Sequence, residues 1–370
     1  MRILITGSDG FIGTNLRVRL AENGITDVAR LTRTATTADL DAECRDADFV
    51  FHLAGVNRPK TDDEFDTGNA GLTQAICERL VAAGRKAPIV YTSSTQASKD
   101  NPYGRSKRAA EAAVESYASR SGAPAHIFRL TNVFGKWSRP NYNSAVATFC
   151  SQIAAGETPT IHDPAAPLRL IYVDDVVSTF IDLLESPAKD AGLRAVEPVY
   201  DTSVGEVVDI IRSIAASRTT LLMPRAGSGL VRALNATYLS FLKPQQFVYD
   251  VPRHSDQRGE FVEMLKTSDS GQFSYFTAHP GVTRGEHYHH SKTEKFLVLQ
   301  GTARFGFRHI VTGECHQIVT RGGEGRIVET VPGWVHSVTN AGTDELIVML
   351  WANEIFNRDL PDTIAQKVDA

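Results

Sequence analysis

The sequence predicts two domains, a doubly wound α/β domain with a parallel sheet followed by an all-β barrel. Its first 130 residues alternate short β-rich apolar runs with helical stretches, the pattern of a parallel sheet. Beyond residue 250, short β-rich runs are separated by glycine-bearing turns. A chain of 370 residues also exceeds one ordinary domain. We place the boundary where Pro244 and two glutamines interrupt a helical pattern, which predicts domains 1–245 and 246–370.

The expected elements follow one another along the chain. Helices are expected at 11–23, 72–83 and 104–120, and the helical pattern returns over 210–242. The expected strands are buried apolar runs at Ile3–Ile5, Asp48–Leu53, Ile89–Ser93, Ala125–Leu130, Lys295–Leu299 and Glu345–Leu350.

Composition narrows the class of protein. Hydrophobic residues make up 42% and charged residues 22%, which favours a buried core and argues against disorder or coiled coil. A net charge of -4 gives no electrostatic reason for a nucleic-acid partner. No apolar run approaches the roughly 20 residues that span a bilayer. Four cysteines without a CxxC pair suggest a reducing compartment, and the first residues form a strand pattern, so we expect a cytoplasmic protein.

A glycine loop follows the first expected strand. Gly7, Gly10 and Gly13 come directly after Ile3–Ile5, where a helix is expected to begin. A turn without side chains lets backbone N–H groups and the helix N-terminus approach a pyrophosphate. We therefore expect a dinucleotide here, and the neighbouring contacts of the same loop are Asp9, Phe11 and Ile12.

A tyrosine and a lysine share one face of the helix expected at 104–120. Because Tyr103 and Lys107 are four residues apart, the ammonium lies beside the phenol and should lower its pKa toward working pH. The phenol can then give its proton to a carbonyl oxygen as a hydride arrives from a nicotinamide. Ser94 is expected to hold the same oxygen, with Ser93 and Thr95 as possible substitutes.

These motifs resemble the extended short-chain dehydrogenase/reductase family over residues 1 to about 243. The resemblance implies a Rossmann fold in which Leu53, Ala54 and Gly55 pass beneath the cofactor riboses. It also implies that 132–243 mainly binds the substrate, a nucleotide sugar, through the candidate contacts Asn132, Asn143 and Arg169. Members of this family often pair, so a homodimer is expected.

The end of the second expected strand bears on the choice of cofactor. An NAD-specific protein usually has an acidic residue there, which binds the ribose 2′-hydroxyl. This chain offers Arg33, and alternatively Arg30. A basic residue suits a 2′-phosphate, so NADPH is the expected cofactor.

A histidine-rich run near residue 290 predicts a metal site. His287 and His289 share one face of a strand, because side chains alternate with a period of two. Together with Glu294 and His336 they supply three imidazoles and a carboxylate, which suits a divalent metal, with zinc preferred. His290 is an alternative to His289 if the strand carries a bulge.

The same segment resembles two kinds of cupin. Residues 273–352 are similar to the metal-binding cupins, although Val331 stands where their second motif usually has proline. The stretches 256–263 and 281–287 are similar to metal-free deoxyhexose epimerases, which implies that Arg284 contacts substrate and that His287 is a base. A metal-bound His287 would conflict with that role, which leaves the identity of the base open, with Tyr288, His290 and Lys292 as further candidates.

The fusion of a reductase to a cupin resembles the CapF family of bifunctional capsular polysaccharide enzymes over the whole chain. That resemblance implies reduction of the C4 ketone of a UDP-linked 2-acetamido-2,6-dideoxy-4-hexulose, coupled to epimerisation at C3 by the cupin, on the way to UDP-N-acetyl-L-fucosamine. Two alternatives stay open. One is a single-activity enzyme whose cupin binds sugar or stabilises a dimer. The other is an NADP-sensing protein, which commonly lacks the Tyr-Lys pair.

Overall fold

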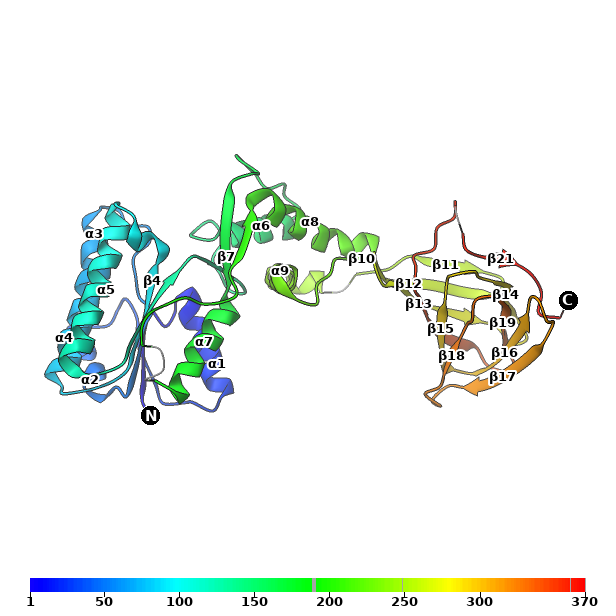
Figure 1. Ribbon diagram of the computed structural model, residues 1–370, viewed down its shortest axis with the longest axis horizontal. Coiled ribbons are helices and arrows are strands. Elements are labelled where there is room, and N and C mark those ends of the chain that lie inside the picture. The colour runs from blue at the N-terminus through cyan, green and yellow to red at the C-terminus, as the bar shows by residue number, and fades with distance from the viewer. Residues whose placement is uncertain (188–190, 248, 360, 370) are drawn as a thin grey trace. The chain divides into compact units, whose positions relative to one another are not determined.

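The computed structural model describes residues 1–187, 191–247, 249–359 and 361–369 (Figure 1). The chain divides into two compact units. The first comprises Met1–Ile211 and Ala233–Leu242, and the second comprises Arg212–Arg232 and Lys243–Ala370.

The first unit is built around a six-stranded parallel sheet with the strand order β2-β1-β3-β4-β5-β8. Its strands are β1 Ile3–Thr6, β2 Val28–Leu31, β3 Phe49–His52, β4 Ile89–Ser94, β5 Ala125–Leu130 and β8 Gly192–Arg194. A three-stranded sheet joins β6 Asn132–Phe134, β7 Pro167–Tyr172 and β9 Tyr200–Ser203. The helices, some of which continue into the second unit, are α1 Phe11–Glu22, α2 Thr37–Asp46, α3 Asp63–Phe65, α4 Leu72–Ala82, α5 Pro102–Ser121, α6 Ala145–Ala154, α7 Val173–Glu185, α8 Val204–Thr220 and α9 Gly229–Leu239.

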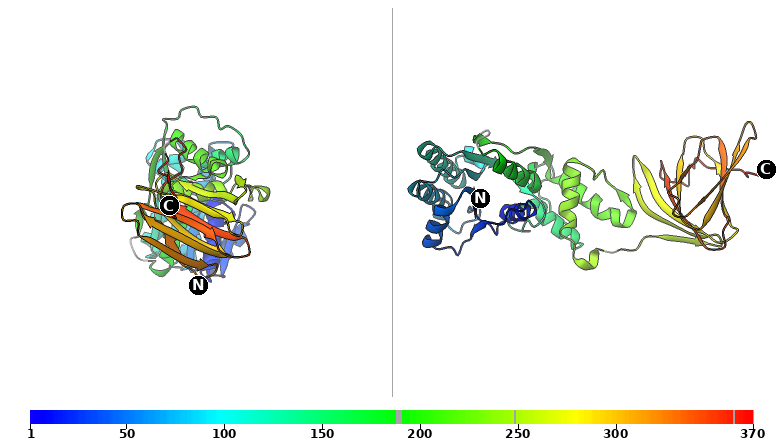
Figure 2. Two further views of the ribbon diagram at one scale, coloured as in Figure 1. Left: turned by 90° about the vertical axis from the view of Figure 1, so that its right-hand side faces the viewer. Right: turned by 90° about the horizontal axis from the view of Figure 1, so that it is seen from below.

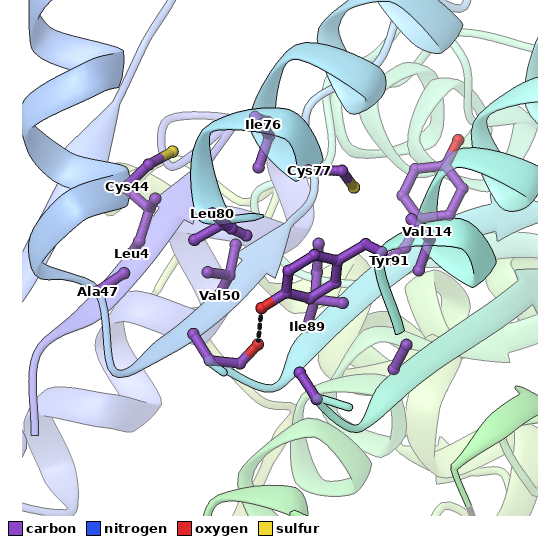
Figure 3. Close-up of a cluster of buried hydrophobic side chains, with 14 of the residues drawn as sticks. Leu4, Cys44, Ala47, Val50, Ile76, Cys77, Leu80, Ile89, Tyr91 and Val114 are labelled. Atoms are coloured by element: carbon purple, nitrogen blue, oxygen red, sulfur yellow. Dashed lines mark hydrogen bonds between the residues drawn. The ribbon is translucent and has the colours of Figure 1, made fainter. Parts of the chain in front are cut away.

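Both faces of the six-stranded sheet are covered, which explains why its strands read as continuous apolar runs. On one face, Leu4, Val50 and Ile89 pack against α2, α4 and α5, and Figure 3 shows this cluster. On the other face, Ile3 and Phe51 pack against α1 and α7. The layers are visible in Figure 1, with α2, α4 and α5 on one side of the sheet and α1 and α7 on the other. This burial fixes the carboxyl ends of the strands, where ligands bind in such sheets.

The second unit contains two β-sheets (Figure 2). An apolar core lies between them. The core joins Phe276 and Phe296 of the larger sheet to Phe305 and Val338 of the smaller one. The larger sheet contains β10 Leu222–Met223, β11 Arg253–Asp256, β12 Gly259–Thr267, β13 Gly271–Ala278, β15 Glu294–Gln300, β18 Ile327–Glu329 and β20 Leu346–Ala352. The smaller contains β14 Thr283–Tyr288, β16 Thr302–His309, β17 Cys315–Arg321, β19 Trp334–Asn340 and β21 Ile364–Ala365.

The predicted fold class is confirmed: a Rossmann-like parallel α/β domain precedes a multi-stranded β domain. The helical pattern over 210–242 is wrong in one detail, because α8 ends at Thr220 and the short strand β10 separates it from α9. Leu221 adopts a φ of 60°, a left-handed conformation that ends the helix there.

Candidate active site and metal centre

A cavity of about 1340 Å³ in the first unit brings together most of the predicted cofactor and catalytic residues. It lies at the carboxyl ends of β1 to β5, the expected position of a ligand in a parallel sheet. The predicted residues that line it are Gly7, Asp9, Gly10, Phe11, Ile12, Gly13, Arg33, Leu53, Ala54, Gly55, Ser94, Tyr103, Lys107, Asn132 and Asn143.

The glycine loop has the geometry that a dinucleotide requires. Gly7 adopts a φ of 68°, and a Cβ added to it would lie 2.8 Å from the Ala54 backbone nitrogen. A Cβ on Gly13 would lie 2.3 Å from the Gly7 carbonyl oxygen. No side chain therefore fits at either position. Helix α1 begins at Phe11 and leaves its N-terminus at the cavity. These residues fit a bound pyrophosphate.

A buried chain of hydrogen bonds supports the second loop of the cavity. The Ala54 N–H donates to Thr6 Oγ1 over 3.2 Å, and Thr6 Oγ1 lies 2.6 Å from His52 Nδ1. His52 Nε2 lies 2.8 Å from Thr73 Oγ1, whose hydroxyl donates to the Asn69 carbonyl over 2.7 Å. Burial lowers the pKa of His52 to about 3, so its ring is neutral. The roles of Thr6, Thr73 and Asn69 were not predicted from the sequence.

Asn69 ties the same loop to the catalytic helix. Its side-chain amide accepts from the Val56 N–H over 2.8 Å and donates to the Ser106 hydroxyl over 3.0 Å. Asn69 lies in a π-helical turn, Asp66–Gly71, which precedes α4. Such turns are frequent at functional sites, but no sequence signal marks this one.

Ser94 and Tyr103 meet at the end of β4. Ser94 is the last residue of that strand, and its side chain lies close enough to the Tyr103 hydroxyl to oppose the effect of burial on the Tyr103 pKa. The two alternatives to Ser94 are less suitable. The Ser93 hydroxyl donates to the buried Glu111 carboxylate, and Thr95 is exposed and does not line the cavity.

The expected effect of Lys107 on the tyrosine is not found. Burial raises the pKa of Tyr103, and the nearby Ser94 side chain only partly opposes this. Lys107 Nζ lies 5.9 Å from the centroid of the Tyr103 ring and donates to the Thr92 carbonyl over 2.9 Å. The raised pKa keeps the phenol protonated, which is the form that a proton donor in a reduction needs.

Lys107 is itself perturbed. Burial lowers its pKa to about 8, although the nearby Glu111 carboxylate acts in the opposite direction. Glu111 also accepts two hydrogen bonds from the Arg129 guanidinium, at 2.9 and 2.7 Å. Glu111 lies four residues, about one helical turn, after Lys107. That spacing is the sequence signal from which its effect on Lys107 could have been predicted.

Arg33 and Arg30 have different surroundings. Arg30 Nη2 lies 2.6 Å from the Asp9 carboxylate, and this bond is the main cause of the lowered pKa of Asp9. Arg33 is exposed at the cavity, and within the described part of the chain it forms no hydrogen bond or ion pair. Arg33 is therefore the arginine available to a ligand phosphate.

The candidate substrate contacts are only partly brought together. Asn132 and Asn143 line the cavity, and Asn143 accepts a hydrogen bond from Arg58 Nε over 3.0 Å. Arg169 does not line it, and the predicted substrate contact there stays a prediction. The antiparallel pairing of β7 with β9 places Asp201 opposite Arg169, with its carboxylate 2.8 Å from Arg169 Nε.

The predicted metal ligands form a compact cluster in the second unit. One ligand atom from each of His287, His289, Glu294 and His336 lies within 4.8 Å of all the others. Among the described atoms, the buried Nε2 atoms of His287 and His336 have no hydrogen-bond partner. Buried nitrogens of this kind are costly unless they bind something, so the cluster fits a divalent cation.

The carboxylate of the cluster is ionised. Burial would raise the pKa of Glu294, but the neighbouring His289 and His336 rings, whose Nε2 atoms lie 3.4 and 3.3 Å from Oε2, hold it well below its usual range. The positive charge of Lys292 adds to this effect, with Nζ 3.0 Å from Glu294 Oε1. Because Lys292 holds Oε1, Oε2 is the oxygen that faces the histidines.

Of the two candidates His289 and His290, the cluster contains His289, and its role as a ligand stays a prediction. A β-bulge does occur in β14, but it lies between Gly285 and His287, before both candidates. The side chains of His287 and His289 therefore remain on one face, and that of His290 is exposed. The ring of Tyr288 packs edge-on against His290, 5.5 Å between centroids.

Arg284 is half-buried and lies outside the cluster. Its Nε donates to the Thr277 carbonyl over 2.9 Å, and burial lowers its pKa. Its Nη2 is buried and has no hydrogen-bond partner in the described residues, so the guanidinium retains a free donor.

Comparison with known proteins matches a family model to each half of the chain. Residues 3–196 match the model of the NAD dependent epimerase/dehydratase family, and 254–364 match that of the polysaccharide biosynthesis C-terminal domain. The crystal structure of the capsular polysaccharide assembling protein CapF from Staphylococcus aureus superposes with a TM-score of 0.91 at 37% identity, covering 99% of this chain and 100% of that one. The chain belongs to the CapF family.

One sequence relative is named for a reaction. The UDP-2-acetamido-2,6-beta-L-arabino-hexul-4-ose reductase of Pseudomonas aeruginosa is 55% identical to this CapF-family chain, over 100% of this chain and 99% of the relative. A UDP-glucuronic acid 4-epimerase from Bacillus cereus, at 20% identity and a TM-score of 0.55, shows a shared fold over 65% of this chain. Of the helices that the structure describes, none has the length and apolarity that crossing a membrane demands.

Proposed function

We propose that this CapF-family protein is a nucleotide-sugar reductase that uses NADPH to reduce the C4 ketone of a UDP-linked 2-acetamido-2,6-dideoxy-4-hexulose. The observation that carries the proposal is the meeting of Ser94, Tyr103 and Lys107 in a cavity that the glycine loop also lines. The name of the relative from Pseudomonas aeruginosa supports the ketone substrate.

The residues of the cavity have distinct proposed roles. The cofactor, when bound, supplies the hydride that the ketone carbon accepts. Tyr103 gives its proton to the ketone oxygen, which completes the alcohol. Ser94 holds the same oxygen by a hydrogen bond, and the Lys107 ammonium, which lines the same cavity, anchors the cofactor ribose.

We further propose that the second unit epimerises the sugar at C3. The 4-keto group acidifies the C3 proton, and a divalent cation, by our preference zinc, supplies Lewis-acid stabilisation of the enolate oxygen when bound. The cluster of His287, His289, Glu294 and His336 would hold that cation. Of the three candidate bases, Lys292 is the one whose side-chain nitrogen contacts a predicted ligand, and its ammonium must lose a proton before it can act as a base.

A deuterium experiment tests both proposals together. The UDP-4-keto-6-deoxy-N-acetylhexosamine is incubated with the protein in D2O without cofactor, and NADPH is added afterwards. Deuterium at C3 followed by NADPH oxidation is the expected result. Oxidation without deuterium would leave the second unit as a binding or assembly module. The absence of both reactions would overturn the substrate class.

Arg33 is expected to select NADPH over NADH. Replacing Arg33 with alanine removes the cation that we expect to bind the 2′-phosphate, and the preference for NADPH should fall by about 10- to 100-fold. The measurement is kcat/KM with each cofactor. Arg30→Ala is the comparison, because Arg30 pairs with Asp9 and does not line the cavity. A larger loss in Arg30→Ala would transfer the role to Arg30.

The pKa of Lys107, about 8, predicts an alkaline limb in the pH profile. Below that pH the ammonium is charged, and as pH rises through it the charge is lost, so kcat/KM for NADPH oxidation should fall. The limb is measured against pH in the wild type and in Glu111→Gln. Since the Glu111 charge raises the pKa of Lys107, its removal should move the limb to lower pH. An unmoved limb would show that another group titrates.

Three expectations about the whole protein remain predictions. They are the division at 245/246, a homodimer and a cytoplasmic location. Limited proteolysis and sedimentation measure the first two directly.

A further inference from the structure

Asp362 lies against the loop that connects His289 to Glu294. Its carboxylate accepts the backbone N–H groups of three consecutive loop residues, His290 at 2.9 Å, Ser291 at 2.7 Å and Lys292 at 2.8 Å. It also accepts the Ser291 hydroxyl at 2.9 Å. Four hydrogen bonds to one carboxylate fix the conformation of this loop.

The backbone of Asp362 contacts a candidate ligand directly. Its carbonyl oxygen is hydrogen-bonded to His289 Nδ1. A carbonyl can only accept, so Nδ1 carries the hydrogen and the Nε2 lone pair is free to face the cluster. That Nε2 lies 3.4 Å from Glu294 Oε2, inside the cluster. A second hydrogen bond of this kind is how proteins orient a metal-binding histidine.

The segment that carries Asp362 is anchored beside a second ligand. Strand β21 pairs with β14, with Ala365 opposite His287. The Gln366 N–H donates to the Glu286 carbonyl over 2.9 Å, and the Val368 N–H donates to the Glu286 carboxylate over 3.2 Å. Glu286 adopts a φ of 63° at the β-bulge, a strained conformation for a residue with a side chain.

We propose that Asp362 is a positioning residue of the metal centre. It holds the His289 ring in the orientation and hydrogen-bonded form that a ligand needs, and it fixes the loop that delivers Glu294. The inference rests on the proposed metal site and adds a residue 73 positions after His289, outside the predicted ligand set.

Metal affinity of the full chain tests the proposal. The protein is stripped with a chelator, and its affinity for Zn²⁺ is measured by competition with a chromophoric chelator. Asp362→Ala should weaken binding by about 10- to 100-fold. Asp359→Ala is the matched control, an exposed aspartate of the same segment, and its affinity should equal that of the wild type. The visible spectrum of the Co²⁺ form should change in Asp362→Ala only.

The outcomes separate the inference from the metal site itself. Failure of the wild type to bind Zn²⁺ or Co²⁺ would overturn both. Loss of binding in His336→Ala with unchanged affinity in Asp362→Ala would overturn the positioning role alone. Should Asp362→Ala not fold by circular dichroism, Asp362→Asn decides, because its amide retains only one acceptor oxygen. Wild-type affinity in that variant would contradict the proposal.

Discussion

The Tyr103→Phe variant is expected to lose NADPH oxidation by about 10²- to 10⁴-fold, because the phenol is the proposed proton donor to the ketone oxygen. Exchange of the C3 proton in D2O should continue at the wild-type rate, since the proposed epimerisation site uses no residue of the first unit. The two rates are measured on the same preparation, by absorbance of NADPH and by NMR of the sugar.

Tyr117→Phe is the matched control for that substitution. Tyr117 lies on the same helix, α5, and its hydroxyl donates to the Ala87 carbonyl over 2.8 Å, away from the cavity lining. Its loss should lower stability by about 1 kcal/mol and leave NADPH oxidation in place. Loss of both reactions in Tyr103→Phe would contradict the proposed division of labour between the two units.

The His336→Ala variant is expected to show the opposite pattern. Loss of a residue that only hydrogen-bonds a metal ligand weakens metal binding by roughly 10- to 100-fold, and removal of the ligand itself should weaken it by more. C3 exchange should disappear. NADPH oxidation by His336→Ala should persist when the ketone substrate has first been equilibrated at C3 by incubation with the Tyr103→Phe variant. His316→Ala, an exposed histidine paired with Glu314, is the control in the same unit.

Mixing the two deficient variants provides a further check on the second prediction. If the reactions are separate, Tyr103→Phe and His336→Ala together should form product from the ketone and NADPH. C3 exchange that survives in His336→Ala would instead show that the metal cluster is not needed for the epimerisation.

The parts of the site that lie close in sequence could be predicted. Gly7, Gly10 and Gly13 follow one strand, and Tyr103 and Lys107 share one helical face, so local geometry alone places each set. His287 and His289 were predicted by strand alternation, which survives because the β-bulge precedes both.

The rest depends on contacts between distant segments. The Asp201 carboxylate accepts a hydrogen bond from the Arg169 guanidinium because β9 pairs with β7. No sequence pattern near Arg169 predicts that pairing. The contact between Asp362 and His289, which are 73 residues apart, likewise depends on a strand pairing, that of β21 with β14. The pKa of Tyr103 was predicted in the wrong direction because burial of its phenol outweighs a lysine whose ammonium points to the Thr92 carbonyl.

The buried hydrogen-bond chain beneath the cavity has a fixed direction. The Thr73 hydroxyl must donate to the Asn69 carbonyl, so it accepts from His52 Nε2–H, and the neutral ring then accepts at Nδ1 from the Thr6 hydroxyl. That hydroxyl in turn accepts the Ala54 N–H. A single arrangement of hydrogens satisfies every member, which leaves one tautomer of the ring. The loop beneath the cofactor site is therefore supported by one fixed pattern of donors and acceptors.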